Sequence, residues 1–175
     1  MSIMKNIFIA AFCFVTPILI SAQSFNKTII EEKSSKPILV GLCDRTAFAD
    51  TNFSWWYKSE YDNYETNKND LDTIKAKIAG VRIVAVMGSW CSDSRREAPR
   101  LFKIIDELKI DSPAVKLICV DRDKKTEGTE IENLDIKLVP TFIFYRGEKE
   151  LGRIVESPQT TLEGDIKSIL NKNGD

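Results

Sequence analysis

The feature that most constrains this chain is a short apolar run that leads directly into a cysteine at the start of a helix. Residues 81–87, Val-Arg-Ile-Val-Ala-Val-Met, are apolar at nearly every position, which is typical of a central strand buried on both faces. Gly88 and Ser89 form a tight turn, and Cys91 follows Trp90 where a helical pattern begins. Unpaired backbone N–H groups and the positive end of the helix dipole favour a thiolate at such a position. We therefore expect Cys91 to be a nucleophile.

The same segment resembles the active-site motif of the thioredoxin superfamily, Trp-Cys-x-x-Cys with a proline eight residues beyond the first cysteine. Here Trp90 precedes Cys91, and Pro99 lies eight residues beyond that cysteine. A second resemblance lies at 138–142, Leu-Val-Pro-Thr-Phe, which is similar to the cis-proline loop that faces the cysteine in that fold. The chain looks like an exported bacterial thioredoxin-family protein with a single-cysteine Cys-x-x-Ser motif.

The resemblance implies an α/β, thioredoxin-like fold, with a central mixed sheet flanked by helices. It also implies roles for particular residues. Cys91 and Ser94 would be the catalytic pair, and Trp90, Val139 and Pro140 would bind the substrate beside the cysteine. No metal or organic cofactor is implied.

The motif departs from the family at its fourth position, where Ser94 replaces the second cysteine. A hydroxyl forms no S–S bond and so cannot release a mixed disulfide, although it can donate a hydrogen bond to the Cys91 sulfur. Ala85 stands where thioredoxins carry a buried aspartate that assists the second cysteine. Arg95 and Arg96 would support the thiolate, and Asp93 would oppose it. Net reduction through an internal second thiol is therefore not expected, whereas isomerisation, exchange with small thiols and covalent capture of a client remain open.

Composition excludes several other kinds of site. The chain has no histidine, which rules out Cys-His and Ser-His-Asp nucleophile systems and imidazole metal ligands. The three cysteines beyond the N-terminal apolar run, Cys43, Cys91 and Cys119, show no C-x-x-C spacing, so a structural zinc site is not expected. The 25 basic residues nearly balance the 26 acidic ones, so nothing indicates a nucleic-acid or anionic membrane partner.

The N-terminus has the pattern of a secretory signal peptide. Lys5 precedes an apolar run at 7–20, and small residues follow at 21–22. The alternative is a retained membrane anchor, but the run is short for a bilayer and Pro17 interrupts it. We expect a signal peptide at 1–22 and a periplasmic or secreted protein without stable membrane insertion. An N-terminal extension at 23–68 and a thioredoxin-like domain at 69–175 would follow.

Periodicity predicts the elements of the mature chain. Residues 24–35 are polar, which is typical of a loose leader. Strands are expected at 37–42 (at the sheet edge), 81–87, 115–120, 141–145 and 151–155, with helices from 69–70, after Cys91, and from Thr160, where Glu163 would complete a capping box. Between 50 and 64 an aromatic stripe indicates a further helix that packs on the main domain or, less commonly for such a stripe, forms a substrate platform. Its members are Phe53, Trp56, Tyr57, Tyr61 and Tyr64.

Three functions are compatible with these sequence features. The first is thiol–disulfide exchange by Cys91 alone, as a disulfide isomerase or monothiol oxidoreductase acting on client thiols or disulfides, with a possible reducing partner thiol. The second is a redox-inactive binding module that keeps the fold and binds client proteins. The third is a glutathione-linked exchange similar to that of single-cysteine glutaredoxins, which the tryptophan before the cysteine disfavours. Cys43 is also a candidate for a disulfide with Cys91, and Cys119 is expected to be a core residue.

Overall fold

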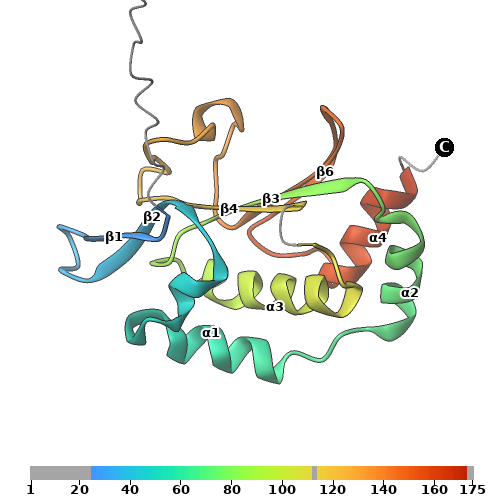
Figure 1. Cartoon of the computed structure of the whole chain (residues 1–175), viewed down its shortest axis with the longest axis horizontal. Helices are drawn as coiled ribbons and strands as arrows, with labels where there is room; N and C mark the ends of the chain where they lie inside the picture. Colours follow the sequence, from blue (N-terminus) through green and yellow to red (C-terminus); the bar gives the residue numbers. More distant parts are fainter. Residues whose placement is uncertain (1–24, 112–113, 173–175) are drawn as a thin grey trace, which may run out of the picture.

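The computed structural model describes residues 25–111 and 114–172, so the expected signal peptide lies outside the described residues. A mixed sheet with the strand order β1-β2-β4-β3-β5-β6 forms its centre (Figure 1). The strands are β1 (Lys27–Ile30), β2 (Pro37–Cys43), β3 (Val81–Met87), β4 (Val115–Cys119), β5 (Thr141–Arg146) and β6 (Lys149–Val155). β3 and β4 are parallel, and the other neighbouring pairs are antiparallel. This confirms the predicted α/β fold with a mixed sheet.

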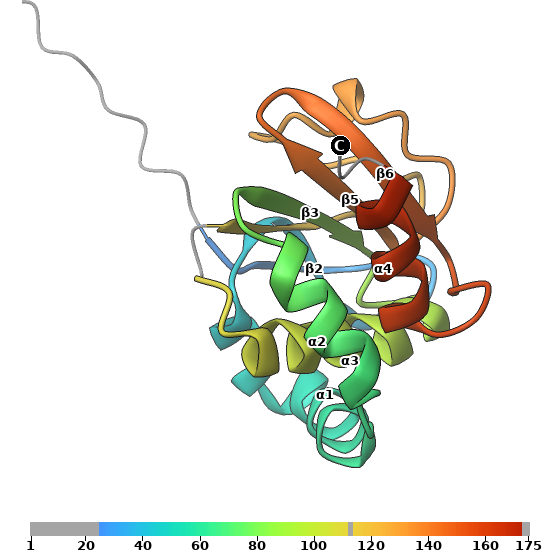
Figure 2. The same ribbon diagram turned by 90° about the vertical axis from the view of Figure 1, so that its right-hand side faces the viewer.

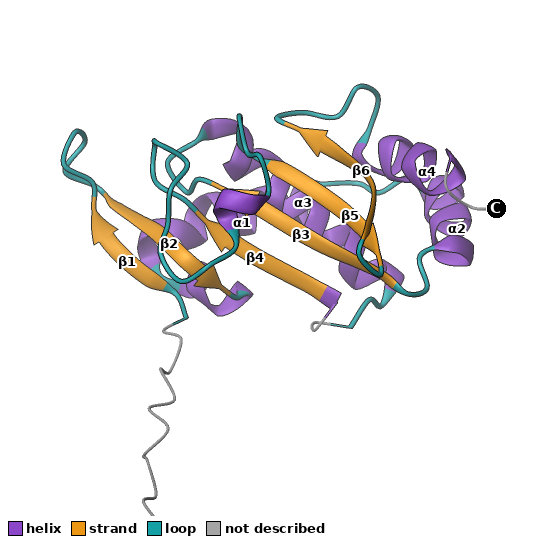
Figure 3. Cartoon of the chain, turned by 90° about the horizontal axis from the view of Figure 1, so that it is seen from above, coloured by secondary structure: helices purple, strands orange, loops and turns teal. Residues whose placement is uncertain are grey.

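The helices lie together against one face of this sheet (Figures 1 and 2). They are η1 (Arg45–Ala49), α1 (Thr51–Asn63), α2 (Lys68–Lys77), α3 (Ser92–Leu108) and α4 (Leu162–Lys172). The connection from β4 to β5, with the short turn η3 (Ile131–Asn133), crosses the opposite face (Figure 3). In the described part of the chain, no helix combines the length and the apolar character needed to cross a membrane.

Strand β3 is buried on both faces, as its continuous apolar sequence predicts. Alternate side chains of the sheet enter two separate hydrophobic clusters. Under the helices, Ile83, Ala85 and Met87 of β3 pack with residues of α3 and α4. On the other face, Val84 and Val86 pack with Val139 and with residues near η3. The carboxyl end of β3, which leads to Cys91, is therefore buried between these two clusters.

The N-terminal extension contributes β1 and β2 to this sheet and packs α1 against α3. Asp50 caps α1, because its side chain accepts a hydrogen bond from the backbone N–H of Asn52. Phe53 and Trp56 are buried against α3, and Tyr57, Tyr61 and Tyr64 pack around them. The aromatic stripe therefore packs against the core, the first of the two predicted roles.

Two predictions for the extension are wrong. Residues 27–30 form β1 rather than part of a loose leader, and β1 occupies the sheet edge that the sequence pattern assigns to β2. All four residues of β1 are exposed, so the strand carries no burial pattern for the sequence to show. Backbone pairing with β2, from Lys27 opposite Val40 to Ile30 opposite Pro37, defines it instead.

The predicted capping box at the start of α4 is also wrong. Thr161, not Thr160, caps the helix, because its hydroxyl accepts from the backbone N–H of Gly164 at 3.0 Å. The Glu163 side chain is buried and accepts instead from the Tyr64 hydroxyl at 2.8 Å and from the Asn67 N–H at 3.2 Å. Together with burial, this carboxylate raises the pKa of Tyr64 well above its usual range. Glu163 thus joins α4 to the segment between α1 and α2.

Candidate functional site

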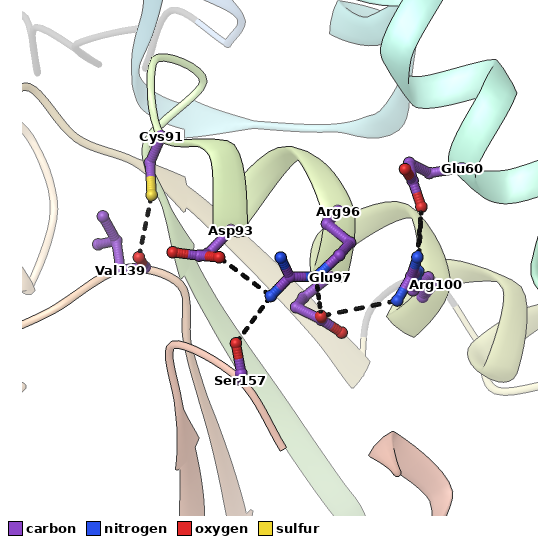
Figure 4. Close-up of polar contacts among 8 residues, drawn as sticks. All are labelled: Glu60, Cys91, Asp93, Arg96, Glu97, Arg100, Val139 and Ser157. Carbon is purple, nitrogen blue, oxygen red and sulfur yellow. Dashed lines mark hydrogen bonds and ion pairs between the residues drawn. The ribbon is translucent and has the colours of Figure 1, made fainter. Parts of the chain in front are cut away.

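Cys91 is the N-cap residue of α3, with an extended backbone at φ −87° and ψ 130°. Its side chain is half-buried, and the sulfur makes no hydrogen bond to the first N–H groups of the helix. The Sγ lies instead 3.2 Å from the carbonyl oxygen of Val139, to which a neutral thiol can donate (Figure 4). The cysteine therefore stands at the helix start as predicted, but its sulfur contacts the 139–140 loop rather than the helix N–H groups.

The 139–140 loop joins the β4–β5 connection to β5 and faces Cys91. The Val139–Pro140 peptide bond is cis. Val139 is buried in the cluster against which Trp90 and Cys91 pack. The carbonyl of Pro140 accepts from the N–H of Glu156 at 2.7 Å, so the turn after β6 borders the same loop. The structure thus brings Trp90, Cys91, Val139 and Pro140 to one place.

The Trp90 indole is held on three sides. Its Nε1–H donates to the Val120 carbonyl at 2.9 Å, and the Arg122 guanidinium lies over the ring at 4.8 Å from its centroid. Gly88 lies beneath it, where a Cβ would come within 2.5 Å of the indole. Arg122 is itself paired with Glu31, in the turn between β1 and β2. The orientation of Trp90 therefore depends on Val120 and Arg122, which directly follow β4, and Glu31 of the β1–β2 turn in turn binds Arg122.

A Gly88→Ala substitution tests this arrangement. A Cβ at that position overlaps the indole, so we expect Trp90 to turn away, to break its bond to Val120 and to cost about 1–3 kcal/mol of stability. NMR of the indole N–H groups should show faster hydrogen exchange for Trp90. The signals of Trp55 and Trp56 serve as internal controls, and an unchanged exchange rate for Trp90 would contradict the packing described.

Ser94 does not have the expected contact with the cysteine. Its side chain is fully buried, and its hydroxyl accepts from the backbone N–H of Gly88 at 3.2 Å. The hydrogen bond that Ser94 could donate to the Cys91 sulfur is not formed: the Ser94 hydroxyl accepts from the Gly88 N–H, while the Cys91 sulfur lies against the Val139 carbonyl. Ser94 therefore stabilises the turn after β3 and does not hold the Cys91 thiol in place.

The two arginines in the first turns of α3 have different partners. Arg96 pairs with Asp93 at 3.0 Å and with Glu97 at 2.6 Å, and it also donates to the hydroxyl of Ser157 at 2.8 Å (Figure 4). Arg95 donates to the Ser89 carbonyl at 2.6 Å. Burial lowers the pKa of Arg95, and a negative charge on Cys91 would act in the opposite direction. Among the described residues, no acidic side chain pairs with Arg95, whereas the charge of Arg96 is offset by Asp93 and Glu97.

Cys43 is not the partner of Cys91. Cys43, Cys91 and Cys119 are free thiols, and Cys43 is buried in the helix-side cluster, whereas Cys91 packs against the cluster on the opposite face. The Cys43 side chain packs in the cluster that contains residues of α3, so the two sulfurs lie on different faces of the sheet. Among the described residues, no group of three or more carboxylate, thiol or imidazole side chains is placed to hold a metal ion.

Comparison with known proteins agrees with this geometry. The family model described as Thioredoxin matches residues 63–168, which include Cys91 and Pro140. The chain belongs to the thioredoxin family. The match begins within α1, so β1, β2 and η1 lie outside it.

The relatives of this thioredoxin-family chain are distant. Mitochondrial thioredoxin O of Oryza sativa subsp. japonica is 30% identical over 100 residues, 55% of each chain. Thioredoxin H5 of the same plant is 24% identical over 107 residues, 59% of this chain and 75% of the relative. The chain thus spans about half the length of the first of these relatives.

Two solved structures show similar chains. A protein of unknown function from Pseudomonas aeruginosa, PA1234, has a TM-score of 0.48 and 17% identity, and the match covers 69% of this chain and 82% of that one. Oxidised thioredoxin O2 of Arabidopsis thaliana has a TM-score of 0.37 and 22% identity, with coverage of 59% and 84%.

Two residues beside the site, Arg122 and Glu31, are not predicted from the sequence. Arg122 follows β4, which is parallel to β3, so the carboxyl ends of both strands lie at the same edge of the sheet. That rule alone would have placed Arg122 near Trp90. Glu31 gives no such signal, because it follows the exposed strand β1 and reaches Arg122 only through the pairing of β1 with β2.

Proposed function

We propose that this protein is exported and catalyses thiol–disulfide exchange with Cys91 as its single nucleophile, with disulfide isomerisation as its favoured activity. The observation that carries the proposal is the placement of one half-exposed sulfur, 3.2 Å from the Val139 carbonyl, with a serine at the position of the second cysteine. Membership of the thioredoxin family supports thiol–disulfide chemistry in general. Export rests on the pattern of residues 1–22.

The chemistry begins when the Cys91 thiolate attacks one sulfur of a client disulfide. The client S–S bond breaks, a mixed disulfide forms, and the departing client sulfur leaves as a thiolate that takes up a proton. A second client thiolate then attacks the mixed disulfide and makes a new client S–S bond, which returns Cys91 to its thiol form. No electrons are gained or lost overall, so the client disulfides are rearranged rather than reduced.

The surroundings of the cysteine suit an extended client segment. The backbone of Val139 and Pro140 would pair with it, as in the proteins that the motif resembles, and the half-buried Trp90 would contact its side chains. Leu138 is 42% exposed and adds apolar surface at the same loop. Glu156 and Ser157, next to Pro140, would narrow the groove on the other side.

One observation favours the second candidate function, a redox-inactive binding module. The Cys91 sulfur lies against a carbonyl oxygen and makes no bond to the helix N–H groups. This arrangement suits a neutral thiol, which is a poor nucleophile. The two functions make opposite predictions for activity with a disulfide-bonded client.

Two assays test the proposal on the wild-type protein. In the first, a small protein with scrambled disulfides is incubated with catalytic amounts of this protein, and recovery of the native pairing is followed. In the second, reduction of insulin by dithiothreitol is followed with and without this protein. We expect accelerated recovery in the first assay and little acceleration in the second, because Ser94 cannot release a mixed disulfide. Absence of any acceleration in the first assay would favour the binding module.

A further inference from the structure

Two cysteines outside the candidate site lie side by side on neighbouring strands. In the antiparallel pairing of β2 with β4, Cys43 is opposite Leu117, and Gly41 is opposite Cys119. Cys43 and Cys119 are therefore diagonal neighbours in the sheet. Both enter the hydrophobic cluster under the helices, so their side chains project from the same face. Gly41, which pairs directly with Cys119, carries no side chain.

The two thiols interact with each other, and both are shielded from solvent. Cys43 is 4% exposed, and Cys119 is fully buried. The interaction with the Cys43 side chain, together with burial, raises the pKa of the Cys119 thiol. A thiol that is buried in this way resists exchange once the core has closed. Any covalent change at this pair therefore belongs to the folding process.

We propose that Cys43 and Cys119 form a disulfide when the chain folds in an oxidising compartment. One thiolate of the pair attacks an external disulfide such as oxidised glutathione, and the external S–S bond breaks to give a mixed disulfide and one free thiol. The second thiolate of the pair then attacks the Sγ of the first cysteine in that mixed disulfide, and the other half of the oxidant leaves as a thiolate that takes up a proton. The pair loses two electrons and two protons, and the external disulfide is reduced to two thiols.

This bond has consequences that do not depend on any activity of Cys91. It links the N-terminal extension covalently to β4, so the edge strands are fixed to the centre of the sheet. A bond between these positions closes a long loop of chain, which restricts the unfolded state strongly. Cys43, Cys91 and Cys119 are the three cysteines after residue 22, so this bond would leave Cys91 as the one free thiol among them.

The experiment uses the full chain, unfolded and reduced, then refolded in a mixture of reduced and oxidised glutathione. Free thiols are blocked with N-ethylmaleimide, and the protein is digested without reductant and mapped by mass spectrometry. We expect a cross-linked pair of peptides that contains Cys43 and Cys119, lighter than the sum of its parts by two hydrogen atoms, and a maleimide adduct on Cys91. Maleimide on both Cys43 and Cys119, or a link from either to Cys91, would overturn the proposal.

Stability measurements provide the second arm. The denaturation midpoint of the refolded wild type should fall when a phosphine reductant is added. The midpoints of Cys43→Ala and Cys119→Ala should not respond to the reductant, since neither variant can form the bond. Cys91→Ala is the matched control and should respond as the wild type does. An equal response of the wild type and both single variants to the reductant would contradict a Cys43–Cys119 bond.

Discussion

Replacing Cys91 with alanine is expected to abolish the recovery of scrambled disulfides, with a loss on the order of a hundredfold or more relative to the wild type. The loss should be this large because no other described thiol is placed to act in its stead. Cys43 and Cys119 are buried under the helices, on the opposite face from the Val139 loop. The isomerisation assay measures the effect, and mixed disulfides with the client, visible on non-reducing gels, should disappear with it.

Ser92→Ala is the matched control for this variant. Ser92 is the next residue along the helix, it is exposed, and its change leaves the sulfur in place. We expect it to keep full activity. If Cys91→Ala binds the unfolded client as tightly as the wild type and both lack isomerase activity, the protein is a binding module. If Cys91→Ala retains isomerase activity, the assignment of the nucleophile is wrong.

The central elements of the fold were predictable because the pattern of apolar residues in each of them shows which side chains are buried. The fully apolar run of β3 and the amphipathic pattern of α3 both identify a buried surface without reference to the rest of the chain. Strand β1 was not predictable, because backbone pairing with β2 holds it in place while its side chains remain in solvent. The role of Glu163 was missed for a related reason: its partners, Tyr64 and Asn67, lie about a hundred residues away along the chain.

In the site, too, local sequence predicted some features, and contacts with distant segments determined the others. Local sequence placed Cys91 at the helix start, and the resemblance to thioredoxins placed the Val139–Pro140 loop beside it. Neither indicated where the sulfur would point. The direction of the Cys91 side chain depends on its extended backbone and on the Val139 carbonyl, which comes from a distant segment. The inward position of Ser94 depends likewise on the turn at Gly88.

Restoring the second sulfur with Ser94→Cys is expected to give the protein an insulin-reducing activity roughly tenfold or more above the wild type. A cysteine at this position lies one turn along α3 from Cys91, so its attack on the mixed disulfide is intramolecular and needs no external thiol. The site is already close-packed, and sulfur replaces a buried hydroxyl at a modest change in volume. The expected gain stays below that of a dithiol thioredoxin, because Ala85 supplies no carboxylate to take the proton of the new thiol.

Ser92→Cys is the control that separates spacing from sulfur content. It adds the same atom to the same helix turn, but at an exposed position directly after Cys91, where two adjacent cysteines cannot readily close a disulfide. Insulin reduction by Ser94→Cys and not by Ser92→Cys means that the missing sulfur alone limits the redox cycle. If a folded Ser94→Cys variant fails to reduce insulin, the rate of reduction is limited by how easily the client disulfide reaches Cys91 past Trp90 and the 139–140 loop. The half-buried sulfur would then be too confined for a folded disulfide client, and only extended client segments would reach it.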